Sequence, residues 1–264
     1  MLKRLLAVLC VALVLIPVRP SAASAAGAVW HVVRPGDTMS GIAAKFGLRT
    51  TDLARWNQVP KPYPVYVDGV LRLNPPPSPL PAWRTRVELV TPGMVNWDPL
   101  KKCPVTPAQL RRVWVSYVDF NGAYHDGSII VRQDVVARAQ RIFQTLYRWR
   151  YRIMAMSPMS VNMPGQTDMS IVTAGYNCRP VGGTKVWSEH ATGTAIDINP
   201  LQNPMIRGRV VAPAAGEFYL NRQRYLIGML HGDGAARAFT ANGLHWGGYW
   251  RSLRDYMHFS LTNR

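Results

Sequence analysis

The sequence predicts an α+β fold in two parts, a small βααβ module at residues 29–74 and a larger α+β domain with a central antiparallel sheet at residues 83–264. The prolines of residues 75–82 remove the amide donors that a helix or sheet needs, so this segment is expected to be an extended linker. Hydrophobic residues make up 48% of the chain and charged residues 17%, which is typical of globular rather than disordered proteins.

Residues 1–26 have the organisation of a secretory signal peptide. Two basic residues precede an apolar stretch from Leu5 to Val18, and small residues follow it. The apolar stretch is shorter than the roughly 20 residues that a membrane-spanning helix needs. We therefore expect export, with cleavage near Ala25 or Ala26 and an uncleaved anchor as the alternative.

The chain is strongly basic, with a formal net charge of +17. The signal peptide contains Lys3, Arg4 and Arg19 and no acid, so its removal leaves +14. Such a charge favours polyanions, either nucleic acid or the acidic polymers of a cell envelope. The cations are scattered without a long basic run or a nucleic-acid-binding motif, so we expect no nucleic-acid partner.

The small module has signals for each of its elements. In order, we expect a strand from Trp30, a turn at Pro35-Gly36-Asp37, a helix capped by Asp37 or Thr38, a second helix at residues 51–56 capped by Thr50 or Thr51, and a strand at residues 70–73. Ile42, Ala43 and Phe46 lie on one face of the first helix, which indicates that this face is buried.

The stretch from Trp30 to Asn74 resembles a LysM module. That resemblance implies binding of glycans that contain N-acetylglucosamine, with Gly36, Asp37 and Thr38 as substrate-binding residues beside Met39 and residues 57–65. The alternative for these loop residues is a role in the turn and the helix cap alone.

The larger domain combines short strands with one long amphipathic helix. The expected elements are an extra strand around residues 87–90, strands at 113–118 and 128–131 joined by a turn at Asp126-Gly127, a helix at 134–151, and strands at 170–176, 194–198 and 257–261. Residues at helical spacing, among them Ala139, Ile142 and Leu146, indicate that the helix packs on the sheet. Met154, Met156 and Met159 are expected in the core.

Two motifs near the C-terminus carry the chemistry. The first runs from Ser188 through His190 to Asp197, and the second comprises residues 255–259 with Asp255 and His258. Two imidazoles and one carboxylate suit a catalytic zinc ion, which keeps one position open. Asp255, three residues before a histidine, is placed to act as a general base, and the alternative is a surface acid paired with Arg251 or Arg254.

The two motifs resemble those of the VanY-like D-Ala-D-Ala carboxypeptidases and L-alanyl-D-glutamate endopeptidases. This resemblance implies that His190, Asp197 and His258 bind zinc and that Asp255 is the catalytic carboxylate. It also matches Arg179 to the substrate arginine of the family.

Three further residues are predicted around the site. Ser188 and Asn199 are expected to orient the ligands. Trp246 is expected either to form a substrate-binding wall of the cleft or to serve packing alone.

The combined interpretation is a secreted, cell-wall-associated zinc peptidase. Its partner is peptidoglycan, with glycan strands on the LysM module and the stem peptide at the zinc site. We favour an L-alanyl-D-glutamate-type endopeptidase, with a D-Ala-D-Ala carboxypeptidase or a non-catalytic wall-binding protein as alternatives.

The cysteines leave two questions open. Cys103 and Cys178 remain after signal removal, and an oxidising exterior permits either a disulfide or two separate buried thiols. A thiol peptidase with Cys178 as the nucleophile is the less favoured enzyme class, because no helix follows Cys178 to lower the thiol pKa.

Overall fold

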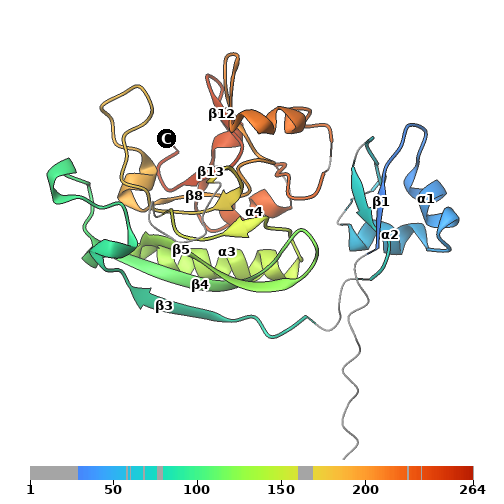
Figure 1. Cartoon of the computed structure of the whole chain (residues 1–264), viewed down its shortest axis with the longest axis horizontal. Coiled ribbons are helices and arrows are strands. Elements are labelled where there is room, and N and C mark those ends of the chain that lie inside the picture. The colour runs from blue at the N-terminus through green and yellow to red at the C-terminus, as the bar shows by residue number, and fades with distance from the viewer. Residues whose placement is uncertain are drawn as a thin grey trace, which may run out of the picture.

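The computed structural model describes residues 29–57, 59, 61–67, 69–75, 80–159, 169–224, 226–232 and 234–263. The predicted signal peptide and residues 76–79 of the predicted linker lie outside these residues. Figure 1 shows a small N-terminal module, coloured blue to teal, beside a larger C-terminal domain. No helix in the described part of the chain is long and apolar enough to cross a membrane.

The N-terminal module has the predicted βααβ order. Its elements are β1 (Trp30–Val32), α1 (Met39–Lys45), α2 (Thr50–Trp56) and β2 (Val70–Arg72). The two strands pair antiparallel with Trp30 opposite Arg72, and apolar residues of both helices pack beneath them. Thr38 caps α1 as expected, since its side chain accepts a hydrogen bond of 3.0 Å from the Gly41 amide.

The cap predicted for α2 is wrong. The residue before the helix is Arg49, which makes no capping bond through its side chain, and Thr50 already belongs to the helix. Asp52 in the first turn instead accepts hydrogen bonds from Arg49 at 2.7 Å and Arg55 at 3.0 Å. A carboxylate near the helix N-terminus is favourable because of the helix dipole, so the acid replaces the missing cap.

A three-stranded antiparallel sheet forms the base of the C-terminal domain. It consists of β3 (Thr85–Leu89), β4 (Leu110–Val118) and β5 (Tyr124–Arg132), in that order. Helix α3 (Val136–Arg148) packs against it, as Figure 1 shows. The periodicity predicted both the helix and its buried face, which includes Ile142 and Phe143.

The predicted turn at Asp126-Gly127 is wrong, because both residues lie within β5. Asp126 pairs with Ser116 and accepts a hydrogen bond of 2.9 Å from its hydroxyl group. The chain turns earlier, where the Asp119 carboxylate accepts a hydrogen bond of 2.8 Å from the Ala123 amide. Asp126 therefore serves a polar pair on the sheet, and Gly127 lies where a Cβ atom would be only 2.8 Å from the Cβ atom of Met156.

A second sheet carries Asp197 and His258 from the two motifs. Its strands are β8 (Ala195–Asp197), β13 (His258–Ser260) and β11 (His245–Trp246), with β13 in the middle. Phe259 of β13 stacks on Phe239 of helix α4 (Ala235–Thr240), with ring centroids 3.9 Å apart. This aromatic packing joins the sheet to the core shared with α3.

Shorter elements complete the domain. The remaining strands are β6 (Ala155–Met156), which is parallel to β7 (Val172–Thr173), and the antiparallel set β9 (Met205–Arg207), β10 (Val210–Ala212) and β12 (Arg254–Asp255). The 3₁₀ helices are η1 (Pro92–Met94), η2 (Pro99–Lys101), η3 (Pro107–Gln109), η4 (Gln133–Val135), η5 (Met169–Ile171), η6 (Glu189–Thr192), η7 (Ala214–Tyr219) and η8 (Gly247–Tyr249).

Cys103 and Cys178 form a disulfide, with their Cα atoms 5.8 Å apart. The bond joins the segment before β4 to the segment that bears Arg179. A sulfur atom in a disulfide cannot act as a thiolate nucleophile, so the thiol peptidase alternative is wrong.

Candidate metal centre

Helix η6 holds His190 in a fixed orientation. The Ser188 side chain caps the helix by accepting a hydrogen bond of 3.3 Å from the His190 amide. Gly193 ends it with a positive φ of 71°, and a Cβ atom there would lie 2.8 Å from the Arg132 amide nitrogen. Only glycine therefore allows η6 to turn into β8 at this point.

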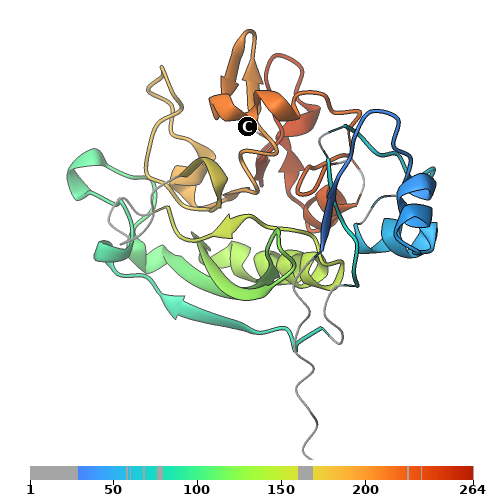
Figure 2. The same ribbon diagram turned by 45° about the vertical axis from the view of Figure 1, so that its right-hand side comes forward.

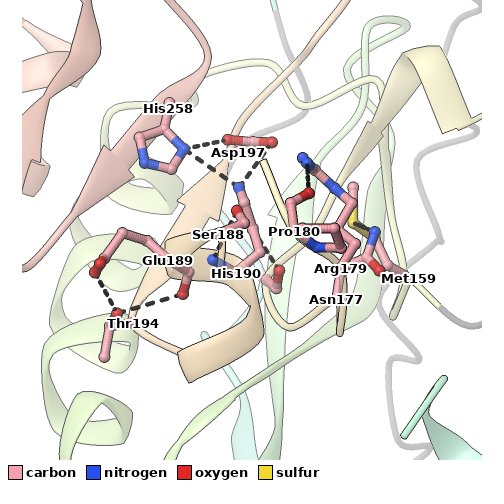
Figure 3. A network of polar contacts seen from close by, with 11 residues as sticks. Met159, Asn177, Arg179, Pro180, Ser188, Glu189, His190, Thr194, Asp197 and His258 are labelled. Carbon is pink, nitrogen blue, oxygen red and sulfur yellow. Dashed lines mark hydrogen bonds and ion pairs between the residues drawn. The ribbon is translucent and has the colours of Figure 1, made fainter. Parts of the chain in front are cut away.

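The tautomer of His190 follows from its hydrogen bond. Its Nδ1 atom lies 2.6 Å from the carbonyl oxygen of Gly175, which can only accept. Nδ1 therefore carries the proton, and the lone pair of Nε2 points away from it toward Asp197 and His258 (Figure 3).

Asp197 and His258 come together through strand pairing. They are directly opposite each other on β8 and β13, so their side chains lie on the same face of the sheet. Asp197 Oδ1 lies 3.1 Å from His258 Nδ1, and Asp197 Oδ2 lies 3.1 Å from His190 Nε2. The three predicted ligands are thus one buried cluster.

The cluster fits a zinc ion. Zinc bonds of about 2.0–2.1 Å in a tetrahedron place neighbouring ligand atoms about 3.3 Å apart. His190 Nε2 and His258 Nδ1 are 3.2 Å apart, and both carboxylate contacts are 3.1 Å. Two imidazoles and a carboxylate that converge at this spacing would hold zinc with one position left for water or substrate.

The two neighbouring histidines keep Asp197 ionised. Its burial opposes the charged form, but His190 and His258 outweigh that effect and hold the pKa of this carboxyl well below its usual range. A carboxylate that stays negative at every physiological pH is a suitable metal ligand.

Asp255 behaves differently from Asp197. Burial, and then the negative charge of Asp197, raise the pKa of Asp255 to about 6. Its Oδ1 atom is buried and accepts no hydrogen bond from the described residues, and no ion pair to Arg251 or Arg254 is present among them. The surface-pair alternative for Asp255 therefore has no support, and the carboxyl is poised to exchange a proton near neutral pH.

The cluster opens into a cleft of about 1030 Å³, which also contains Asp255. Three cations line it: Arg179, Lys185 and Arg207. Figure 3 shows Arg179 near the cluster, on the segment that leads to η6. A site with three cations around a buried carboxyl and a candidate metal cluster suits a peptide substrate that carries carboxylates.

Several residues of the cleft were not predicted. Lys185 and Arg207 are among them, and so are the apolar residues Met159, Met169, Trp187 and Trp250. Met159 was expected in the core, but it lines the cleft, where its sulfur accepts a hydrogen bond of 3.4 Å from Asn177.

Trp246 is not on the cleft wall. It is 4% exposed, belongs to the core, and donates a hydrogen bond of 2.9 Å from its indole to the carbonyl oxygen of Tyr256. The packing alternative is therefore the correct one for this residue. Trp250, four positions later, lines the cleft instead.

Asn199 supports the chain after β8 rather than a ligand. Its side chain donates to the carbonyl oxygen of Arg152 at 2.7 Å and accepts from the Met154 amide at 2.9 Å. Its own backbone has a positive φ of 45°. These bonds fix the position of the strand that presents Asp197.

The three predicted glycan-binding residues form the turn before α1. Gly36 has a positive φ of 86°, and the Asp37 carboxylate accepts hydrogen bonds from the Arg34 amide at 2.9 Å and from His31 at 2.8 Å. The Arg34 and His31 bonds lower the pKa of Asp37. Thr38 caps the helix. Each residue therefore has a folding role, and glycan contact by these residues stays a prediction.

Comparison with known families gives two matches. Residues 182–261 match the family model described as D-alanyl-D-alanine carboxypeptidase, and residues 31–74 match the LysM domain model. Comparisons with curated proteins and with solved structures give no match. The first match includes all three residues of the buried cluster and Asp255, whereas Arg179 lies just before it.

Proposed function

We propose that this chain, which joins a LysM module to a domain of the D-alanyl-D-alanine carboxypeptidase family, is a secreted zinc-dependent hydrolase of peptidoglycan stem peptides. One observation carries the proposal. The buried cluster of His190, Asp197 and His258 has the spacing of a zinc site and faces a cleft that contains a carboxyl with a raised pKa.

Zinc held by the cluster would supply a Lewis acid toward water and the scissile carbonyl group. Asp255 takes the proton from the attacking water and later gives it to the leaving amine. A carboxyl with a pKa near 6 suits both steps, because it loses and regains a proton close to neutral pH.

The cations of the cleft position the substrate. Arg179 offers a planar fork of donors that matches a carboxylate or a peptide carbonyl oxygen. Lys185 and Arg207 line the same cleft and extend the positive field. Stem peptides that carry free carboxylates are therefore favoured over neutral peptides.

The LysM module concentrates the enzyme on its substrate. A glycan-binding module on the same chain makes the encounter with the stem peptide intramolecular, which raises its effective concentration. The net charge of +14 that remains after signal removal adds attraction to acidic wall polymers.

The bond we propose is the one between L-alanine and D-glutamate. A volume of about 1030 Å³ exceeds what a single terminal residue needs, so the cleft has room for peptide on both sides of the cluster. The match to a D-alanyl-D-alanine carboxypeptidase family favours the alternative, removal of a terminal D-alanine.

Mass spectrometry of digested muropeptides tests both the activity and the bond. We expect release of a peptide that begins with glutamate, complete loss of this activity after chelation, and its return with zinc. Loss of a single terminal alanine identifies the carboxypeptidase instead. No cleavage by the zinc-loaded protein contradicts the enzymatic function and leaves a wall-binding protein.

A further inference from the structure

A second cavity lies where the LysM module meets the peptidase domain. This junction pocket has a volume of about 290 Å³, and its aromatic lining consists of Trp30 and Trp56 from the module with Trp149 and Tyr151 from the domain. Figure 1 and Figure 2 both show the module beside the domain. The pocket shares no lining residue with the zinc cleft.

Two buried arginines lie beside this pocket, and one hydrogen bond of Arg72 joins the module to a turn of the domain. Arg72 of β2 is 3% exposed and donates hydrogen bonds to the carbonyl oxygens of Asn74 at 3.1 Å and Asn121 at 3.0 Å. Arg152 donates to the carbonyl oxygen of Asp119 in the same turn, at 3.3 Å. Gly122 in this turn leaves no room for a Cβ atom beside the two guanidinium groups.

The wall of the pocket is also fixed. The carbonyl oxygen of Gly228 accepts hydrogen bonds from Tyr151 Oη at 2.6 Å, Asn203 Nδ2 at 2.9 Å and Asn199 Nδ2 at 3.2 Å. Asn199 follows Asp197 by two residues, so the pocket wall is attached to the strand that presents a metal ligand. A preformed pocket of this kind binds a ligand without the cost of ordering loops.

The lining combines aromatic faces with polar groups. Trp149 is 48% exposed, so its indole is accessible to a ligand that enters the pocket. Arg152 and His231 add polar groups, and no acidic side chain is among the described lining residues. A pyranose ring has an apolar C–H face and a rim of hydroxyl groups, so it matches indole faces and hydrogen-bonding groups together.

We propose that the junction pocket binds one N-acetylhexosamine unit of a peptidoglycan glycan strand. This site differs from the LysM loop at Gly36–Thr38, because Trp30 begins β1 whereas that loop follows the other end of the strand. Of the described residues in the second expected LysM segment, 57–65, Asn57 alone lines the pocket. Its volume is near the lower limit for small-molecule pockets and suits a single sugar ring. A glycan strand held by both parts of the chain would present its stem peptides to the zinc cleft.

The proposal rests on the proposed glycan-binding function, but its first test does not require catalysis. Calorimetric titration of the full chain with N-acetylglucosamine tetramer compares the parent with Trp149→Ala. We expect about tenfold weaker binding in the variant and partial recovery in Trp149→Phe. Phe218→Ala, an exposed aromatic residue in neither pocket, is the matched control and should bind as the parent does.

The indole N–H signals in NMR spectra locate the sugar. We expect the tetramer to shift the signals of Trp30, Trp56 and Trp149, and an unlinked stem peptide to leave them in place. Parent-like affinity in Trp149→Ala with unmoved indole signals would overturn the proposal, as would shifts caused by the peptide but not the sugar.

Kinetics separate this proposal from the peptidase activity. In Trp149→Ala we expect unchanged hydrolysis of the unlinked stem peptide and a raised KM for glycan-linked substrate. An equal loss on both substrates contradicts the glycan subsite. A chain that cleaves neither substrate but still binds the tetramer through Trp149 refutes the peptidase function alone.

Discussion

His190 Nε2 and His258 Nδ1 face each other across 3.2 Å, although the two residues come from a 3₁₀ helix and a strand far apart in the sequence. Because the proton of His190 is held at Nδ1 by Gly175, the Nε2 atom offers only a lone pair to this gap. A cation between the two rings satisfies both imidazoles and the carboxylate of Asp197. The fold around these residues is therefore expected to depend on metal.

Removal of the metal should lower both activity and stability. We expect chelation to abolish peptide hydrolysis. If the free metal concentration before chelation is a thousandfold above Kd, chelation should also reduce the free energy of unfolding by about 4 kcal/mol. Elemental analysis and thermal unfolding measure the two effects. His190→Ala should behave as the chelated protein, whereas His245→Ala, an exposed histidine outside the cluster, should retain metal. Equal metal content in the two variants would contradict the site.

Replacement of Asp255 should separate catalysis from metal binding. Asp255→Asn removes the proton acceptor but no cluster ligand, so we expect kcat to fall by about 10²- to 10⁴-fold with the metal retained. Glu189→Gln is the matched control, because Glu189 lines the same cleft and accepts a hydrogen bond from Thr194. A parent-like rate in the Asp255 variant would exclude the proposed proton transfer.

The pH profile should have an acid limb set by Asp255. Burial and the charge of Asp197 raise the pKa of this carboxyl to about 6, and only the carboxylate accepts a proton. Activity should therefore fall as pH decreases through the pKa, by about tenfold per unit below it. A bound dication lowers the pKa, so the midpoint of kcat/KM is expected at or below pH 6. If the midpoint of the acid limb lies above pH 7, a group other than Asp255 controls it.

The three proposed metal ligands could be singled out from the sequence because their residue types suit zinc and because their two motifs resemble those of a zinc peptidase family. The motif containing His190 and Asp197 spans one helical turn and one strand, and His258 has its own motif. Their convergence needs only that β8 and β13 pair, which places Asp197 opposite His258. The same local signals predicted the βααβ module and α3.

The rest of the cleft depends on packing that no local pattern encodes. Met159 and Met169 look like core residues in the sequence, and Arg207 looks like one of many scattered cations. Arg207 reaches the cleft because β9 pairs with β12, the strand that carries Asp255. Trp246 illustrates the reverse case. Its position near a motif favours a place on the cleft wall, but the sequence does not reveal that its side chain is buried in the core.

The β9–β10 hairpin offers a sharp test of substrate recognition. Arg207 lines the cleft, whereas Arg209, two residues later, is exposed and does not. Arg207→Ala should raise KM for an acidic stem peptide about tenfold, because a charge-assisted hydrogen bond is lost, and Arg209→Ala should leave KM unchanged. Steady-state kinetics at two salt concentrations measure both. Equal effects would reduce the role of Arg207 to general surface charge.

The disulfide should both stabilise the domain and position Arg179, the proposed substrate-binding arginine. Cys103 and Cys178 are 75 residues apart, and closing a loop of that length is worth about 4 kcal/mol in the chain-entropy account. The double variant Cys103→Ser, Cys178→Ser is therefore expected to unfold at lower denaturant concentration by a comparable free energy. Reduction of the parent protein is the matched control and should produce the same shift.

A kinetic effect should accompany that loss of stability. Cys178 immediately precedes Arg179, so loosening this segment is expected to raise KM more than it lowers kcat, while the cluster on η6, β8 and β13 keeps its metal. Metal content and steady-state kinetics well below the unfolding midpoint separate the two effects. If kcat falls while KM stays constant, the disulfide supports the cluster itself rather than the substrate side of the cleft.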